Sequence, residues 1–178
     1  MDKPPVVIVP YNPDWPGRFE AEAALIREQI GSHLEALEHI GSTAVPSLAS
    51  KPILDIMPGV RDLSVAEFCV KPLASIGYTY VPEHEREMPE RRYFRKGPPE
   101  GRTHHLHMVE TASDFWQRHL LFRDYLRTHD ETAREYEGLK RRLAREYGTD
   151  REAYTEAKTA FIAPVVERAR REQARGTR

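Results

Sequence analysis

The sequence predicts an α+β protein in which a mixed β-sheet with flanking helices is followed by a helical C-terminal third. In the first two-thirds of the chain, short apolar runs alternate with segments of helical spacing, and a strand–turn–strand pattern follows at 91–110. From Ser113 onward only helical spacing occurs. This order is typical of α+β proteins rather than of bundles or sandwiches. Because the chain has no repeat and no Gly/Ser linker, we expect one domain over residues 1–178, sheet-rich at 1–110 and helical at 113–173.

The sheet-rich part begins with alternating strand and helix signals. Apolar runs bounded by Gly or Pro predict strands, whereas apolar residues at intervals of three and four predict helices. We therefore expect strands at 6–9, 37–41, 53–57 and 78–81, helices at 19–30 and 64–76, and a short helix or loop at 42–50. Gly31 and Gly77 follow the two helices, in positions typical of helix ends.

A β-hairpin and then helices complete the predicted order. The segment GPPEG at 97–101 is a strong turn signal between two candidate strands, 91–96 and 103–110. Beyond Ser113, about three helices are expected, because apolar stripes recur at 115–126, 139–143 and 154–165.

The composition excludes several classes of protein. The 27 basic and 28 acidic side chains leave a formal net charge of −1, whereas a protein that coats nucleic acid needs a large basic excess. No apolar run is long enough to span a bilayer, and the N-terminus lacks the apolar core of a signal peptide. A single cysteine, Cys69, forms neither an intrachain disulfide nor a cysteine-based zinc site. We therefore expect a cytoplasmic protein without a membrane partner and without extended nucleic-acid binding.

The residues Gly41, Ser42 and Thr43 lie where the strand at 37–41 is expected to end. Glycine lets the backbone approach a ligand closely, and Ser or Thr caps a following helical turn. Backbone N–H groups and the helix dipole then point at one place, which suits a phosphate group. The alternative is an ordinary strand–turn–helix cap. His39, in the preceding strand, is a further candidate for the site.

Asp55 lies among the apolar residues of the strand at 53–57, shortly after Ser42. A carboxylate buried there costs several kcal/mol unless it is paired or binds a metal. A hydroxyl and amide cradle beside a carboxylate-held cation is typical of phosphate-transfer sites. The alternative is an aspartate at a strand end, bonded to backbone amides or to Lys51.

Two histidines can complete a site with Asp55. His105 and His107 alternate along one expected strand and therefore share a face. Beside Asp55 they would offer two nitrogens and one carboxylate, a set that suits one Zn, Mn or Fe ion better than a pair of Mg ions. We therefore treat all three as candidate catalytic and metal-binding residues, with Mg, Mn or Zn as the candidate cofactor. The alternative is a pair of hydrogen-bonded histidines lining a cleft, and His104 and Glu110 offer further ligands on the other face.

Basic side chains border the proposed site. Lys51 precedes the strand that carries Asp55, and Arg92 and Arg95 lie on the expected hairpin. Guanidinium groups suit phosphate or carboxylate, and the interleaved Tyr93 can stack on a base. The alternative is a solvated, charged hairpin.

Two lysines lie in the helical part. Lys158 follows Tyr154 and Lys140 follows Tyr136, each by four residues, so that each pair shares one helix face. Such pairs are usual at the edge of a packing face, where the lysine stem covers apolar surface. Lys158 is in addition a candidate for the site.

Several of these segments together resemble the GrpB-like family. HIGSTAVP at 39–46 and KPILDI at 51–56 look like its signature, and the resemblance covers nearly the whole chain. It also includes YNPDW at 11–15, HHLH at 104–107, FRDYLR at 122–127, Tyr136, Leu139, Lys140, Tyr154, Lys158 and Phe161. The family implies a nucleotidyltransferase-like fold, which occurs alone or appended to dephospho-CoA kinase.

The wider nucleotidyltransferase superfamily adds an expectation about the chemistry. Its pattern is an apolar residue, Gly and Ser, then an Asp, then a second carboxylate two residues later. The segment IGS at 40–42 and Asp55 fit, but Met57 stands in place of the second carboxylate. The resemblance implies binding of a nucleotide or phosphorylated small molecule, with metal-dependent nucleotidyl transfer as one hypothesis. The alternatives are a nucleotide-binding module without transfer chemistry and a single-metal Asp–His–His hydrolase.

Overall fold

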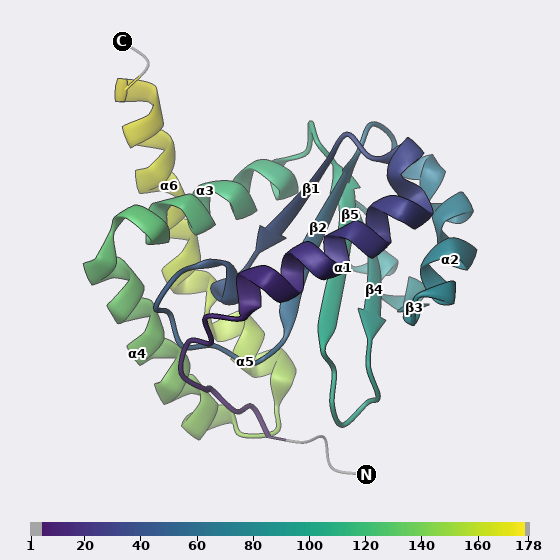
Figure 1. Ribbon diagram of the computed structural model, residues 1–178. Coiled ribbons are helices and arrows are strands. Elements are labelled where there is room, and N and C mark those ends of the chain that lie inside the picture. The colour runs from purple at the N-terminus through teal and green to yellow at the C-terminus, as the bar shows by residue number, and fades with distance from the viewer. Residues whose placement is uncertain (1–4, 177–178) are drawn as a thin grey trace.

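The computed structural model describes residues 5–176, which form a five-stranded mixed sheet and six α-helices (Figure 1). The strands are β1 (Ala36–Ile40), β2 (Leu54–Val60), β3 (Tyr78–Tyr80), β4 (Arg91–Lys96) and β5 (His104–Glu110). The helices are α1 (Trp15–Ile30), α2 (Ala66–Ser75), α3 (Asp114–Thr128), α4 (Asp130–Tyr147), α5 (Arg151–Ala157) and α6 (Thr159–Gly176). The fold is therefore α+β with a helical C-terminal region, as the sequence predicted.

The sheet has the strand order β1-β2-β5-β4-β3. β2 and β5 run parallel, whereas β1–β2, β5–β4 and β4–β3 are antiparallel. The predicted hairpin is the β4–β5 pair, which the turn at 97–101 closes. The parallel pairing places β5 directly beside β2, so that Asp55 and His105 are register partners.

One face of the sheet is covered by α1 and α2. Figure 1 shows α1 running across this face and α2 lying toward the β3 edge. Ile56, Phe94 and Leu106, each from a different strand, are fully buried beneath these helices. Successive side chains of a strand point to opposite faces of the sheet. The polar neighbours of these three residues on β2, β4 and β5 therefore point to the other face.

The opposite face is covered only in part. α3 packs over the β1 and β2 side, where Ile40, Met57, Val109 and Phe115 form a second buried cluster. A third cluster ties the loop after β1 to the helical region, since Val45 and Leu48 pack on residues of α3 and α4. On this face, Asp55 of β2 lies within electrostatic reach of Lys158, at the break between α5 and α6.

Two predicted elements differ in the structure. The segment 6–9 is not a strand: Val9 forms an isolated bridge to Ser50, while Val6 packs on the helical region and donates to the Gly148 carbonyl oxygen. Val6 and Ile8 pack against the helical region while Val7 is exposed, so the apolar run did not indicate a sheet strand. The helical region has four helices rather than three, because a one-residue break at Lys158 separates α5 from α6 without disturbing the apolar spacing.

Within the described residues, no helix has the length and apolar character needed to cross a membrane.

Candidate functional site

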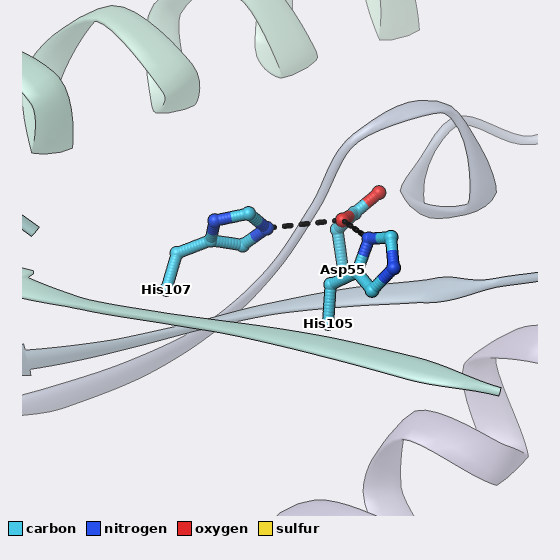
Figure 2. Close-up of side chains that lie close together, drawn as sticks. All are labelled: Asp55, His105 and His107. Atoms are coloured by element: carbon cyan, nitrogen blue, oxygen red, sulfur yellow. Dashed lines mark hydrogen bonds and ion pairs between the residues drawn. The ribbon is translucent and has the colours of Figure 1, made fainter. Parts of the chain in front are cut away.

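The candidate site lies on the partly uncovered face of the sheet, where β2, β5 and β4 are neighbours. Asp55, His105 and Arg95 are register partners across these three strands, and His107 is the partner of Tyr93. Because side chains alternate along a strand, all five point to the same face. Figure 2 shows the two imidazoles approaching the same carboxylate from the neighbouring strand.

Asp55, His105 and His107 form a compact group. The Nε2 atom of His107 lies 3.1 Å from Asp55 Oδ1, and the Nδ1 atom of His105 lies 3.4 Å from the same oxygen (Figure 2). One ligand atom from each residue lies within 4.8 Å of the other two. The three side chains are 31%, 21% and 14% exposed, so the group is accessible to a small ligand from solvent.

The hydrogen bonds define the protonation of this group. Arg91 Nη1 lies 3.2 Å from His107 Nδ1. Since a guanidinium can only donate, His107 Nδ1 accepts and its Nε2–H donates to Asp55. Burial lowers the pKa of His107, which keeps the ring neutral. Burial alone would raise the pKa of Asp55, but hydrogen bonds from His105 and His107 hold it well below its usual range.

Gly41 supports the Asp55 carboxylate from the end of β1. Its φ of 71° and ψ of −172° lie in a region that is essentially restricted to glycine. A Cβ at this position would lie 2.7 Å from Asp55 Oδ2. The glycine is therefore required by both the backbone conformation and the close approach of the carboxylate.

Ser42 lies at the start of a short 3-10 helix, Ser42–Ala44, and contacts the helical region. Lys140 of α4 donates to Ser42 Oγ at 2.9 Å and also to the carbonyl oxygen of Ala49. Lys140 is only 2% exposed, and its ammonium lies 4.9 Å from the centroid of the Tyr136 ring. Burial and the nearby Lys158 lower the pKa of Lys140 to about 7.

Lys51 and Lys158 lie near the Lys140–Ser42 contact. The side chains of both lysines approach the ring of Tyr154. Their ammonium groups are 5.5 Å and 4.7 Å from the centroid of the Tyr154 ring. Burial and the charge of Lys51 lower the pKa of Lys158 to about 8. Burial also lowers the pKa of Lys51, whereas the charge of Asp55 raises it. Both lysines are therefore within electrostatic reach of Asp55.

The structure brings together most of the predicted site residues but not all of them. Tyr93 and Arg95 share the face of Asp55, whereas Arg92, His104 and Glu110 point to the opposite face. Arg92 pairs with Glu85 and donates to the Pro89 carbonyl oxygen. His104 lies near Glu22, and Glu110 accepts from the backbone of Leu63. His104 and Glu110 thus lie on the other face of the sheet, where the sequence placed them, and Arg92 lies there too, away from Asp55.

Two further candidates are part of the protein interior. His39 is buried, stacks on Phe19 with ring centroids 4.8 Å apart, and shares a 2.9 Å hydrogen bond with Thr43 Oγ1. Burial lowers the pKa of His39 to about 4, so the ring is neutral. Thr43 is buried as well. Both side chains therefore position the turn that contains Ser42 rather than face a ligand.

Comparison with known proteins identifies the family. The family described as GrpB protein matches residues 5–168. The chain belongs to the GrpB family. A UPF0157 protein of Pseudomonas aeruginosa is 42% identical over 170 residues, which cover 92% of this chain and 67% of the relative. The UPF0157 protein YqkA of Bacillus subtilis is 39% identical, and the match covers 93% of this chain but 48% of YqkA, about half its length.

A solved structure and a more distant group of relatives extend this comparison. The crystal structure of conserved protein GrpB from Enterococcus faecalis matches with a TM-score of 0.83 and 35% identity, covering 94% of this chain and 99% of that one. A dephospho-CoA kinase of Mycolicibacterium paratuberculosis is 27% identical over 188 residues, covering 93% of this chain and 46% of the kinase. A GrpB-like segment therefore forms part of a longer protein named as a kinase.

In this GrpB-family chain, Asp55, His105 and His107 form a group that could hold a metal ion. Metal–ligand distances of about 2.0–2.2 Å in a tetrahedral site require donor atoms roughly 3.3–3.6 Å apart. The two donor contacts to Asp55 Oδ1, 3.1 Å and 3.4 Å, are close to that range. His107 would have to carry its proton on Nδ1, which now faces the Arg91 donor. Arg91 therefore opposes the metal-bound form of His107.

Sequence reasoning assigned Lys140 to a packing face and did not single out Arg91. The helical spacing of Tyr136 and Lys140 was recognised, but periodicity does not show what a helix face contacts. Arg91 stands two residues before Tyr93 on β4, so the alternation that placed His105 and His107 together could have found it.

Proposed function

We propose that this GrpB-family protein binds a nucleotide or another phosphorylated small molecule on the uncovered face of its sheet, together with one divalent cation. The observation that carries this proposal is the proximity of the Asp55–His105–His107 group to a hydroxyl and several ammonium groups. Carboxylate and imidazole suit Mg, Mn or Zn, whereas ammonium and hydroxyl groups suit phosphate oxygens. A cation in this position would polarise a phosphoryl oxygen.

The proposed site holds one cation rather than two. Met57, at the position of the second superfamily carboxylate, is 0% exposed and lies in the cluster beneath α3. Gly41, Ser42 and Asp55 support a nucleotidyltransferase-like arrangement, but Met57 removes the carboxylate that would bridge a second ion. Nucleotidyl transfer by this chain would therefore proceed with a single cation, and a binding module without transfer chemistry is the alternative.

Phosphoester hydrolysis is the second candidate function. The donor set of two imidazoles and one carboxylate favours it, since three protein ligands leave a coordination position for water or substrate. The dephospho-CoA kinases among the relatives give a reason to include coenzyme A precursors among the ligands tested.

A thermal-shift panel tests the proposal. The purified protein is heated with nucleoside triphosphates, nucleoside diphosphates and coenzyme A precursors, each with and without Mg, Mn or Zn. We expect at least one phosphorylated compound to raise the Tm, with a larger shift when the metal is present. If no compound shifts the Tm under any metal, the proposal is overturned.

Two variants assign the effect to the site. Asp55→Asn and His105→Ala should each abolish the metal-dependent part of the shift, whereas the exposed Asp130→Asn should not. Release of pyrophosphate from a triphosphate, lost in Asp55→Asn, would support transfer, and release of orthophosphate would support hydrolysis. Binding without release of either would support the module without chemistry.

A further inference from the structure

Lys51 and Lys158 form an unusual pair, because two ammonium groups contact one aromatic side chain. Lys51 lies in the loop before β2, and Lys158 lies in the break between α5 and α6. Their Nζ atoms lie 5.5 Å and 4.7 Å from the centroid of Tyr154, which is 1% exposed. The loop before β2 and the α5–α6 junction, which are distant in the sequence, therefore meet at this point.

Within residues 5–176, neither ammonium of this pair has a carboxylate partner. The ion pairs within 4.0 Å in this part of the chain include neither Lys51 nor Lys158. Both side chains are half-buried, and the charge of one lowers the pKa of the other. A cation–π contact supplies attraction to the ring but no counter-charge. Two like charges are thus held near each other without neutralisation.

Other groups at the site add to the same imbalance. Lys140 lies close enough for its pKa to be lowered by Lys158 and Lys51, after the larger effect of burial. On β4, Arg95 Nε is buried and has no hydrogen-bond partner among the described residues. Asp55 is the carboxylate whose charge acts on both Lys51 and Lys158. Glu137 acts on Lys140, so Asp55 is left to balance Lys51 and Lys158, and one carboxylate cannot balance two ammoniums when it also holds a divalent ion.

We propose that Lys51 and Lys158 bind a chain of at least two linked phosphates, with Asp55 at one end of that chain. A single phosphate group carries too little charge to neutralise both ammoniums when a divalent cation already occupies Asp55. Lys140 is a positioning residue, since it is buried and holds Ser42 and Ala49. The inference rests on the proposed function, because it names the ligand class of the same site.

Calorimetric titration in EDTA tests this inference without a metal. The probes are inorganic triphosphate, pyrophosphate and orthophosphate. We expect triphosphate and pyrophosphate to bind, and orthophosphate to bind at least tenfold more weakly. Lys51→Met and Lys158→Met should each weaken triphosphate binding at least tenfold, whereas Lys71→Met, which removes an exposed lysine from α2, should change it less than twofold.

The Tm in the absence of ligand shows whether the variants fold. Lys51→Met and Lys158→Met should melt no lower than the wild type, because each removes a half-buried charge that has no carboxylate partner within residues 5–176 and keeps the apolar stem. If both variants bind triphosphate as tightly as the wild type, or if the wild type binds none of the probes in EDTA, the inference is overturned. A lower Tm in both variants would also count against it, since the lysines would then be structural.

Asp55→Asn separates this inference from the proposed function. In EDTA the variant should bind triphosphate at least as tightly as the wild type, because it removes a negative charge next to the phosphate chain. With Mn²⁺ it should lose the gain in affinity that the wild type shows. Lysine-dependent binding with no effect of metal would uphold the inference and overturn the proposed cation. A metal effect on binding that does not depend on the lysines would uphold the proposed cation and overturn the inference.

Discussion

The backbone conformation of Gly41 controls the position of Asp55. An alanine there would adopt a conformation that costs about 1–3 kcal/mol and would place its Cβ 2.7 Å from Asp55 Oδ2. We expect Gly41→Ala to lower the free energy of unfolding by that amount and to weaken metal binding at least tenfold, measured by chemical denaturation and calorimetry. Gly138→Ala, where a Cβ meets nothing in α4, should instead stabilise the protein by about 0.5–1 kcal/mol. Unchanged metal binding in Gly41→Ala would show that the carboxylate does not hold the ion.

The hydrogen bond from Arg91 to His107 leads to the prediction that a variant binds metal more tightly than the wild type. Arg91 requires His107 Nδ1 to accept, whereas a metal at Nε2 requires the same nitrogen to carry the proton. We expect Arg91→Gln to tighten Zn²⁺ or Mn²⁺ binding at least tenfold in calorimetric titration, because the glutamine oxygen can accept from Nδ1–H. Arg92→Gln is the matched control, since its side chain points to the other face of β4. Equal or weaker binding in Arg91→Gln would remove His107 from the set of ligands.

At the scale of the elements, local signals in the sequence predicted the hairpin. They did not predict how segments distant in the sequence pack together. The turn residues at 97–101 and the alternation of β5 predicted that His105 and His107 share a face, and the structure has them so. Arg92 and Arg95 were both assigned to the site from their place on the hairpin, although the same alternation turns them to opposite faces of β4. Lys140 could not be assigned, because only the docking of α4 on the loop after β1 shows what it contacts.

The contact between α4 and that loop should make the stability of the protein depend on pH. The pKa of Lys140 is about 7 and that of Lys158 about 8, lowered first by burial, against about 10.4 in an unfolded chain. Between these values the unfolded state binds more protons, so stability rises with pH. The cost of charging both lysines is complete below about pH 7 and disappears as the pH approaches 10. We expect the Tm to rise by several degrees from pH 7 to pH 9.

Lys140→Met provides the control for this pH dependence. The variant should show a smaller rise in Tm over the same interval, whatever its absolute stability, because one of the two titrating lysines is gone. Lys71→Met should keep the full rise. A slope in Lys140→Met equal to that of the wild type would mean that other groups cause the effect.

At the scale of the whole molecule, the net charge of −1 hides an uneven distribution, since basic groups surround Asp55. A divalent cation approaching this site alone is repelled by the lysines, and a polyphosphate approaching alone is repelled by Asp55. The binding of each ligand should therefore favour the binding of the other, by the same factor in either order of addition.

We expect pyrophosphate to tighten Mn²⁺ binding to the protein at least tenfold, in addition to any effect of Mn²⁺–pyrophosphate complexes in solution. Electron paramagnetic resonance measures the protein-bound Mn²⁺. Lys158→Met should reduce this coupling from the phosphate side and Asp55→Asn from the metal side. Tight Mn²⁺ binding to the wild type without any phosphate would show that the surrounding lysines do not control the site.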